Sequence, residues 1–264
     1  MAELIGDKGL DLSRAALKKL MTGRDRHYDF FSTEAWDVFS FKEDFNGPTI
    51  DTYRWTVGNG GGLSAASPAI SVGVVNGIIT MVTGTAGDNT ASSTLAGGRH
   101  FRGDSNAIIT ARLAISAVVT NVKVEVGFRD AITTTAAAHA VVDAKATPTF
   151  TSTDGAVWIL DTADNAYWEG VAVANTTGAT TLEAAISPTA ATYEYLQVAL
   201  VDGVAFYSRF DADGYRTYGP TAQAAAVTAT VLLSPHLTIE AKNTTSKSLF
   251  VDAVWLYQAR TSTP

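Results

Sequence analysis

Alternating hydrophobic and polar positions are clearest in the last third of the chain, where they predict β-strands joined by tight turns. Residues 195–201 alternate with a period of two, and residues 204–210 form a second run of the same kind. Asp202-Gly203 separates the two runs, and an Asp-Gly pair favours a type I′ hairpin turn because both positions take a positive φ. Asp213-Gly214 repeats this signal before a third strand at residues 215–218. The pattern therefore predicts an antiparallel meander, which Gly219-Pro220 is expected to end.

Two more strands are predicted near the end of the chain. Residues 237–242 alternate, a polar turn follows at residues 243–246, and residues 249–257 form the last long strand. Strict alternation places one set of side chains on one face, Leu249, Val251, Ala253, Trp255 and Tyr257, and the other set on the opposite face, Phe250, Asp252, Val254 and Leu256. Because both faces are largely apolar, we expect a central strand with a buried Trp255.

Earlier apolar runs predict further β-strands over most of the chain. Residues 84–98 are small and polar and are predicted to form an exposed loop, and the Ala/Thr-rich residues 133–150 give no clear prediction. Eleven to fourteen strands in all predict a two-sheet β-sandwich. The earlier predicted strands are residues 69–72, 77–82, 107–115, 121–129, 157–160, 167–173 and 181–185.

The first forty residues differ from the rest and predict one helix, at residues 11–23. The helix would have a narrow apolar stripe, so it would be marginal unless it docks on another surface. That surface could belong to the same chain or to a neighbouring subunit, and both alternatives stay open. We therefore predict an arm at residues 1–40, a sandwich at residues 41–260 and a tail at residues 261–264. The stripe consists of Leu10, Leu17, Leu20 and Met21.

Composition narrows the classes of partner. Charged residues make up 17% of the chain against 46% hydrophobic residues, and the net charge is −7. A chain with this charge and no basic run is not expected to bind nucleic acid, and no apolar stretch is long enough to predict a membrane span. A weakly charged Ala/Thr surface suits contact with neighbouring subunits, although an ordinary β-protein surface has the same composition. Cysteine is absent, so disulfides and thiol chemistry are excluded.

Residues 41–55 carry a segment with a family resemblance. An Asp-Phe-Asn-Gly-Pro run is followed by Ile-Asp-x-x-Arg-Trp, and this resembles the opening of concanavalin A-like jelly-roll domains of the lectin/glucanase and laminin-G-like type. Residues 251–255 resemble the last strand of such domains. The resemblance implies an all-β concanavalin A-like jelly roll with Trp55 packed under the sheets. It gives structural places to Asp44, Phe45, Asn46, Gly47, Asp51 and Trp55.

Catalytic residues are not predicted. Glucanases of this kind carry a Glu-x-Asp-x-x-Glu pattern that turns two carboxylates toward one cleft, and this chain has no such pattern. Glu125 is expected to stand alone on its strand face, and Glu169 and Glu240 also lack a carboxylate two residues away. The histidines at positions 27, 100, 139 and 236 have no metal-binding spacing. We expect no catalytic residue, cofactor or metal.

Two short motifs have simple explanations. Asp211-Ala212-Asp213-Gly214 is similar to the start of a calcium loop, but the other ligands of such a loop are missing and a turn explains the motif. Arg102-Gly103-Asp104 matches an integrin-recognition tripeptide, and a β-turn is the expected role.

Aromatic residues on the predicted strands have two possible roles: they could stack on a sugar ring, or they could fill the core. They are Trp158, Tyr167, Trp168, Tyr207, Tyr215 and Tyr218.

Together these patterns predict a non-enzymatic structural protein of a large symmetric assembly. The resemblance implies a bacteriophage virion protein, such as a capsid decoration, cement or tail-associated protein, assembled in the host cytoplasm. Other copies of the chain and other subunits are the expected partners, in a homo-oligomer such as a trimer. A carbohydrate-binding module for attachment to a host surface is the alternative, with a glycan as ligand.

Overall fold

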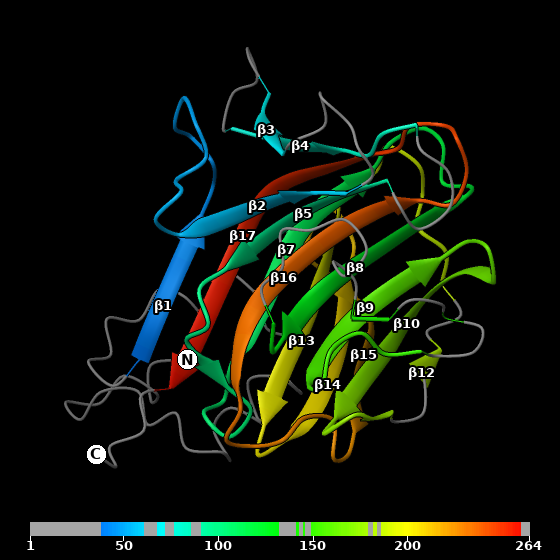
Figure 1. Ribbon diagram of the computed structural model, residues 1–264. Helices are drawn as coiled ribbons and strands as arrows, with labels where there is room; N and C mark the ends of the chain where they lie inside the picture. The colour runs from blue at the N-terminus through cyan, green and yellow to red at the C-terminus, as the bar shows by residue number, and fades with distance from the viewer. Residues whose placement is uncertain are drawn as a thin grey trace.

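The structure of the protein, a computed structural model, consists of two antiparallel β-sheets packed face to face (Figure 1). It describes residues 38–60, 68–71, 77–85, 91–131, 141–142, 145, 149–178, 182–183 and 186–259. Within these ranges every regular element is a strand, and no helix is long and apolar enough to cross a membrane. The predicted sandwich is confirmed, and it has the two-sheet arrangement that the alternating patterns require.

The eight-stranded sheet has the strand order β15-β14-β13-β7-β17-β4-β3. The long β17 contacts β4 along its first half and β1 along its second half, so β1 continues the line of β4. The strands of this sheet are β1 (Val38–Glu43), β3 (Ala69–Ile70), β4 (Ile79–Val82), β7 (Ile108–Ile115), β13 (Glu194–Val201), β14 (Val204–Phe210), β15 (Arg216–Gln223) and β17 (Ser248–Ala259).

The nine-stranded sheet has the order β11-β10-β9-β8-β16-β5-β2, with β12 beside β10 and β6 beside β16. Neighbouring strands in this sheet pair antiparallel, and β8 lies between β9 and β16. Its strands are β2 (Trp55–Asn59), β5 (Ser92–Gly97), β6 (Phe101–Arg102), β8 (Val122–Arg129), β9 (Gly155–Asp161), β10 (Asn165–Ala174), β11 (Thr177–Gly178), β12 (Leu182–Glu183) and β16 (Leu232–Ala241).

The main core lies between the two sheets, and aromatic side chains join them. The Trp158 and Tyr207 rings, one from each sheet, meet edge to face with their centroids 5.4 Å apart. The Tyr207 hydroxyl donates to the Val171 carbonyl at 2.9 Å. Gly170 leaves room for the Tyr207 ring, since a Cβ at this position would lie 2.7 Å from it. These contacts fix the spacing of the sheets at this point.

The predicted turns are confirmed. Asp202 and Gly203 have φ values of 50° and 74°, as a type I′ turn requires, and β13 and β14 pair on either side of them. The Asp211 carboxylate accepts the main-chain N–H groups of Asp213 and Tyr215, so this motif is a turn. In the Arg102-Gly103-Asp104 motif, the Arg102 guanidinium donates to the Asp104 carboxylate at 2.7 Å.

The strict alternation predicted for the last strand is wrong. A β-bulge between Val251 and Ala253 interrupts the register of β17 with β7, so the inward face changes from odd to even positions. Leu249, Val251, Val254 and Leu256 therefore all belong to the main core. Ala253, Trp255 and Tyr257 lie on the outer face of the eight-stranded sheet, where Trp255 is still buried, as predicted.

Two other boundaries also differ from the prediction. Part of the predicted loop at residues 84–98 is the strand β5, whose residues are all buried. Gly219-Pro220 does not end the meander, because β15 continues through it to Gln223.

The predicted helix at residues 11–23 lies outside the described residues, as does its stripe of Leu10, Leu17, Leu20 and Met21. β1, the first strand in the described part of the chain, runs from Val38 and so includes residues that lie before the expected domain boundary at residue 41.

Candidate functional site

The outer face of the nine-stranded sheet, where a ligand groove could lie, is covered by the chain itself. Side chains of β8, β9, β10 and β16 that point away from the main core are nevertheless buried. Val141 and Val142 lie over this face and form a second apolar cluster with Val157, Ile159, Val171 and Val173, against which Phe150 packs. We call Val141, Val142 and Lys145 the covering segment.

Glu125, at the centre of β8, holds the covering segment through its main chain. Its two carboxylate oxygens accept the N–H groups of Val141 at 2.6 Å and Val142 at 2.9 Å. Next to it on the same strand, the Lys123 ammonium donates to the Val142 carbonyl at 2.8 Å. One carboxylate and one ammonium therefore satisfy three main-chain groups of the segment, which would otherwise be buried without partners.

Charges from β16 complete this buried network. The Lys123 Nζ lies 2.6 Å from a Glu240 carboxylate oxygen, and the His236 Nε2 lies 3.6 Å from Glu125. Burial opposes the charge on Glu125, but His236, Lys123 and the Val141 N–H together hold its pKa below the ordinary value. In the same way, burial opposes the charge on Lys123, but Glu240 and Glu125 raise its pKa. The surroundings of Glu125 in the folded protein thus favour its charged form.

Lys145 anchors the covering segment at a second place. Its buried ammonium donates to the Asn165 side-chain oxygen at 2.7 Å and to the Tyr167 carbonyl at 3.2 Å, and it pairs with Glu169 at 3.2 Å. Glu169 is therefore part of a structural ion pair.

The sequence suggested that Glu125 stands alone on its strand face, and this expectation is wrong. Antiparallel pairing of β8 with β16 brings Glu240 and His236 beside it.

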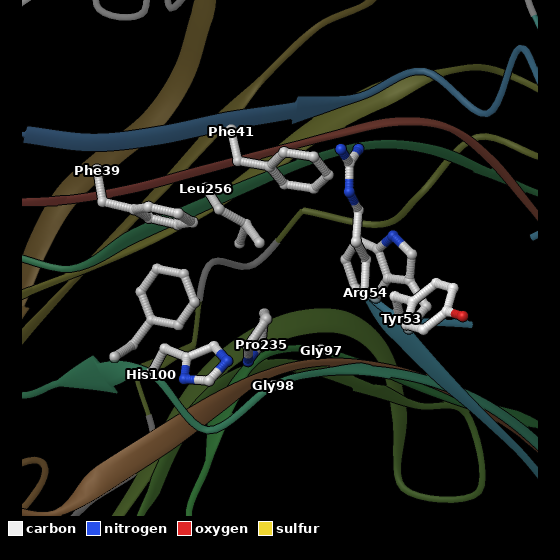
Figure 2. A pocket seen from close by; sticks show the side chains of 11 residues that line it. Phe39, Phe41, Tyr53, Arg54, Gly97, Gly98, His100, Pro235 and Leu256 are labelled. Carbon is white, nitrogen blue, oxygen red and sulfur yellow. The ribbon is translucent and has the colours of Figure 1, made fainter. Parts of the chain in front are cut away.

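An open cavity of about 290 Å³ lies at one side of the sandwich, between β1 and β2, which are edge strands of the two sheets (Figure 2). We call it the aromatic pocket. Most of its walls are apolar, and the polar side chains are Arg54, His100 and Tyr53. Its lining residues are Phe39, Phe41, Tyr53, Arg54, Trp55, Gly97, Gly98, His100, Phe101, Pro235 and Leu256.

Several contacts shape the mouth of the aromatic pocket. The Arg54 guanidinium stacks over the Phe41 ring at 4.7 Å and lies 3.7 Å from the Glu43 carboxylate. The other wall residue on β1, Phe39, packs edge to face on Phe101 but keeps 40% of its surface exposed. Tyr53 is fully exposed, at 100%. The large aromatic side chains of Phe39 and Tyr53 therefore remain exposed beside an apolar cavity. Exposed aromatic groups around an apolar cavity are typical of binding sites.

A second, more polar cavity of about 420 Å³ lies on the outer face of the eight-stranded sheet. Its charges are largely compensated, because Arg112 pairs with Asp252 at 2.7 Å and Lys42 pairs with Asp44 at 3.8 Å. It is lined by Lys42, Asp44, Asn46, Arg112, Tyr195, Ala212, Asp252, Ala253 and Trp255. Neither cavity contains Glu125, Glu169 or Glu240, so neither brings a glutamate pair toward a substrate.

The predicted stacking residues do not form one site. Trp158, Trp168 and Tyr207 are buried in the main core, where no sugar can reach them. Tyr218 packs on Trp158 at 5.7 Å. Tyr167 and Tyr215 are exposed, at 37% and 58%, but neither lines a described cavity. Sequence reasoning missed Phe39 and Phe41 on β1 and Tyr53 in the turn before β2, which line one pocket only because these edge strands of the two sheets lie close together.

Metal binding finds no support in the part of the chain that the structure describes. There, no three side chains of His, Asp or Glu gather in a way that could hold a metal ion. His236 lies in the Glu125 network, and His100 lines the aromatic pocket.

Comparison with solved structures identifies the fold. The chain is similar to a protein of unknown function from Shewanella oneidensis MR-1, with a TM-score of 0.60, 14% identity and coverage of 96% of this chain and 97% of the other. It is also similar to peanut lectin, with a TM-score of 0.58, 11% identity and coverage of 86% and 99%. A third structure is a Bacillus licheniformis β-glucanase, with a TM-score of 0.52, 11% identity and coverage of 84% and 98%.

The protein therefore has the fold of the concanavalin A-like lectins and glucanases, as the opening and closing motifs suggested. No protein-family model matches the sequence, and no curated protein matches it significantly. At these low identities the structural likeness shows the fold alone, and the fold is shared by binding proteins and enzymes.

Proposed function

We propose that this chain is a non-catalytic subunit of a larger protein assembly. The observation that carries the proposal is the contrast between two surfaces. The outer face of the nine-stranded sheet is filled by Val141, Val142 and Lys145, with its carboxylates engaged by protein groups. The aromatic pocket is open and has exposed aromatic side chains at its mouth.

The chemistry of the aromatic pocket favours a protein neighbour. A buried sugar needs several hydrogen-bonding groups, whereas the inner walls here consist mainly of Phe39, Phe41, Trp55, Phe101, Pro235 and Leu256. Protein interfaces are enriched in aromatic residues and Arg at their centres, and both are present here. A cavity of about 290 Å³ is large enough to receive one apolar side chain of a neighbour.

A bacteriophage virion is the most concrete form of this proposal. It rests on the resemblance of residues 41–55 and 251–255 to concanavalin A-like jelly rolls, a kind of domain that resembles phage head-decoration, cement and tail-associated proteins. It also rests on the low share of charged residues in the chain, 17%. In this form the part of the predicted arm at residues 1–40 that precedes β1 would carry Leu10, Leu17, Leu20 and Met21 to a neighbouring subunit. A trimeric assembly stays a prediction.

Light scattering of the purified full chain, combined with a glycan array, tests the proposal. We expect an oligomer or higher assembly and no glycan binding. A chain that stays monomeric over the accessible concentration range and binds or hydrolyses a glycan would contradict it.

Carbohydrate binding is the second candidate, and one observation favours it. Tyr53 is fully exposed beside the half-exposed Arg54, so a flat ring and a hydrogen-bond donor stand together at the mouth of the pocket. The fold is also that of lectins, including peanut lectin. Micromolar binding on a glycan array that is lost in Tyr53→Ala and kept in Tyr215→Ala would establish this alternative.

A further inference from the structure

The outer face of the eight-stranded sheet carries large aromatic side chains that are almost completely buried. Tyr195 and Tyr257 are each 1% exposed, and Trp255 is 5% exposed. They do not belong to the main core, which takes the alternate residues Leu196 and Leu256 from the opposite face of the same strands. Large side chains on the outward face of a sheet stay exposed unless a further layer lies over them. Something other than the nine-stranded sheet therefore excludes water from this face.

The buried area extends across the middle of the sheet and is bordered by cations. Ile108, Thr110 and Ala199 also point outward from β7 and β13, and they are at most 1% exposed. Three cations lie over aromatic rings of this face, and the ion pairs with Asp44 and Asp252 compensate only part of their charge. The face therefore suits a segment with aromatic and acidic side chains. The cation and ring pairs are Lys42 over Trp255 at 5.8 Å, Arg112 over Tyr195 at 5.7 Å and Arg216 over Phe210 at 5.5 Å.

Residues 1–37 are the longest range outside the described residues, and they are joined directly to this sheet. β1 begins at Val38 and lies beside the half of β17 that carries Trp255 and Tyr257 (Figure 1). β17 and β13 are two strand spacings apart, which is about 10 Å. Eleven residues of extended chain span about 36–40 Å. The residues immediately before Val38 are therefore long enough to cross the buried area.

The sequence just before β1 has the composition that this face requires. Residues 27–37 read His-Tyr-Asp-Phe-Phe-Ser-Thr-Glu-Ala-Trp-Asp. Four of these residues are aromatic and three are acidic, and none is Lys or Arg. In an extended chain alternate residues point to the same side, so Tyr28, Phe30 and Trp36 would share one side. Such a segment can place aromatic rings on the sheet and carboxylates beside its cations.

We infer that residues 27–37, the aromatic strap, lie across the outer face of the eight-stranded sheet of their own chain. The strap belongs to the same copy because the face is already buried in a single chain. This inference goes beyond the proposed function and does not depend on it. The predicted stripe of Leu10, Leu17, Leu20 and Met21 precedes the strap and stays available to a neighbouring subunit.

Tryptophan fluorescence tests the strap in the full-length chain. Trp36→Phe removes the tryptophan of the strap and keeps an aromatic ring, so Trp255 is the one remaining tryptophan outside the main core. We expect weak quenching by acrylamide, a neutral quencher, in this variant. A chain that begins at Val38 has the same tryptophans, and it should show a new, strongly quenched component. Trp255→Phe in the shortened chain should abolish that component.

Thiol labelling gives a second readout, because the chain has no cysteine of its own. Thr110→Cys places a thiol on the covered face, and Ala111→Cys, the next residue of β7, places one in the main core. In the full chain both thiols should be protected. In the chain that begins at Val38, the protection of Thr110→Cys should be lost and that of Ala111→Cys should remain. Circular dichroism and a cooperative thermal transition will show that each variant is folded.

Substitutions within the strap keep the test open if the shortened chain does not fold. The double variant Phe30→Asp with Trp36→Asp should also expose Trp255, whereas Thr33→Asp, on the other side of an extended strap, should not. Continued protection of Trp255 and Thr110→Cys in a folded chain that lacks the strap would overturn the inference. Protection that disappears on dilution of the full chain would assign the strap to a second copy and contradict the contact within one chain. A protected monomer would support the strap and contradict the proposed assembly, so the two failures are distinguishable.

Discussion

The carboxylate of Glu125 accepts the main-chain N–H of Val141 at 2.6 Å, which joins the central strand of the nine-stranded sheet to a segment lying over it. Glucanases use a pair of carboxyl groups that face the substrate to cleave the glycosidic bond. In this protein the Glu125 carboxylate instead binds the main chain of the covering segment. The Glu125 carboxylate is therefore buried and bonded to the chain itself.

Replacing Glu125 tests how strongly this relation stabilises the fold. Glu125→Gln keeps the shape but removes the charge that accepts two N–H groups and faces Lys123 and His236. We expect a loss of about 1–3 kcal/mol in the free energy of unfolding, measured with urea. Asp44→Asn is the control, because its ion pair with Lys42 is exposed and should contribute less than about 1 kcal/mol. Equal effects of both changes would contradict a buried Glu125 anchor.

The pH dependence of stability follows from the same group. The folded protein holds the pKa of Glu125 below its ordinary value of 4.5, so the unfolded chain binds this proton more readily. The contribution of Glu125 is therefore complete above the unfolded pKa and is lost as the pH falls through the lower folded pKa. The urea midpoints of wild type and Glu125→Gln should therefore converge progressively as the pH is lowered below about 4.5. A difference that stays constant over this range would refute the assigned direction.

The two segments that resemble concanavalin A-like domains, residues 41–55 and 251–255, place their tryptophans in different surroundings. Trp55 is 1% exposed, packs on Phe45 and belongs to the main core, so Trp55→Ala should cost about 3–5 kcal/mol. Trp255 belongs to a separate outer cluster with Tyr195, Phe210 and Ala253, and we expect a smaller cost for Trp255→Ala. Urea unfolding gives both values. Rapid quenching of fluorescence by iodide at either position would contradict its burial.

Removing the N-terminal segment tests the proposed arm. A chain that begins at Val38 keeps β1 complete, so it should fold with a cooperative thermal transition while losing the ability to form the larger assembly. Light scattering and circular dichroism measure the two properties. If the shortened protein is insoluble or lacks a cooperative transition, the first residues are part of the domain's own core.

The sequence predicted the fold well where local chemistry decides the structure. Asp202-Gly203 determines its turn through positive φ values, and alternation on β8 correctly separates Val124 from Glu125. Alternation failed at Asp252 because a bulge adds one residue without any change in composition. β5 was missed because Ser92, Ser93 and Thr94 are small and polar, yet all are buried by neighbouring strands.

The candidate sites were harder to predict because they depend on register between distant strands. Glu125 and His236 are more than a hundred residues apart and meet only because β8 pairs with β16. The aromatic pocket likewise draws on Phe39, Phe101 and Leu256, which come from three strands. No local pattern indicates such proximity. The sequence also does not distinguish a buried aromatic residue such as Trp158 from an exposed one.

Sedimentation analysis of the purified full-length chain, run together with a glycan hydrolysis assay, tests the central claim most directly. The account predicts a stable or concentration-dependent oligomer with no detectable turnover of glycans. A monomer that hydrolyses a glycan, with the activity lost in Glu125→Gln or Glu169→Gln, would show that the covered face is a working active site and would contradict the account.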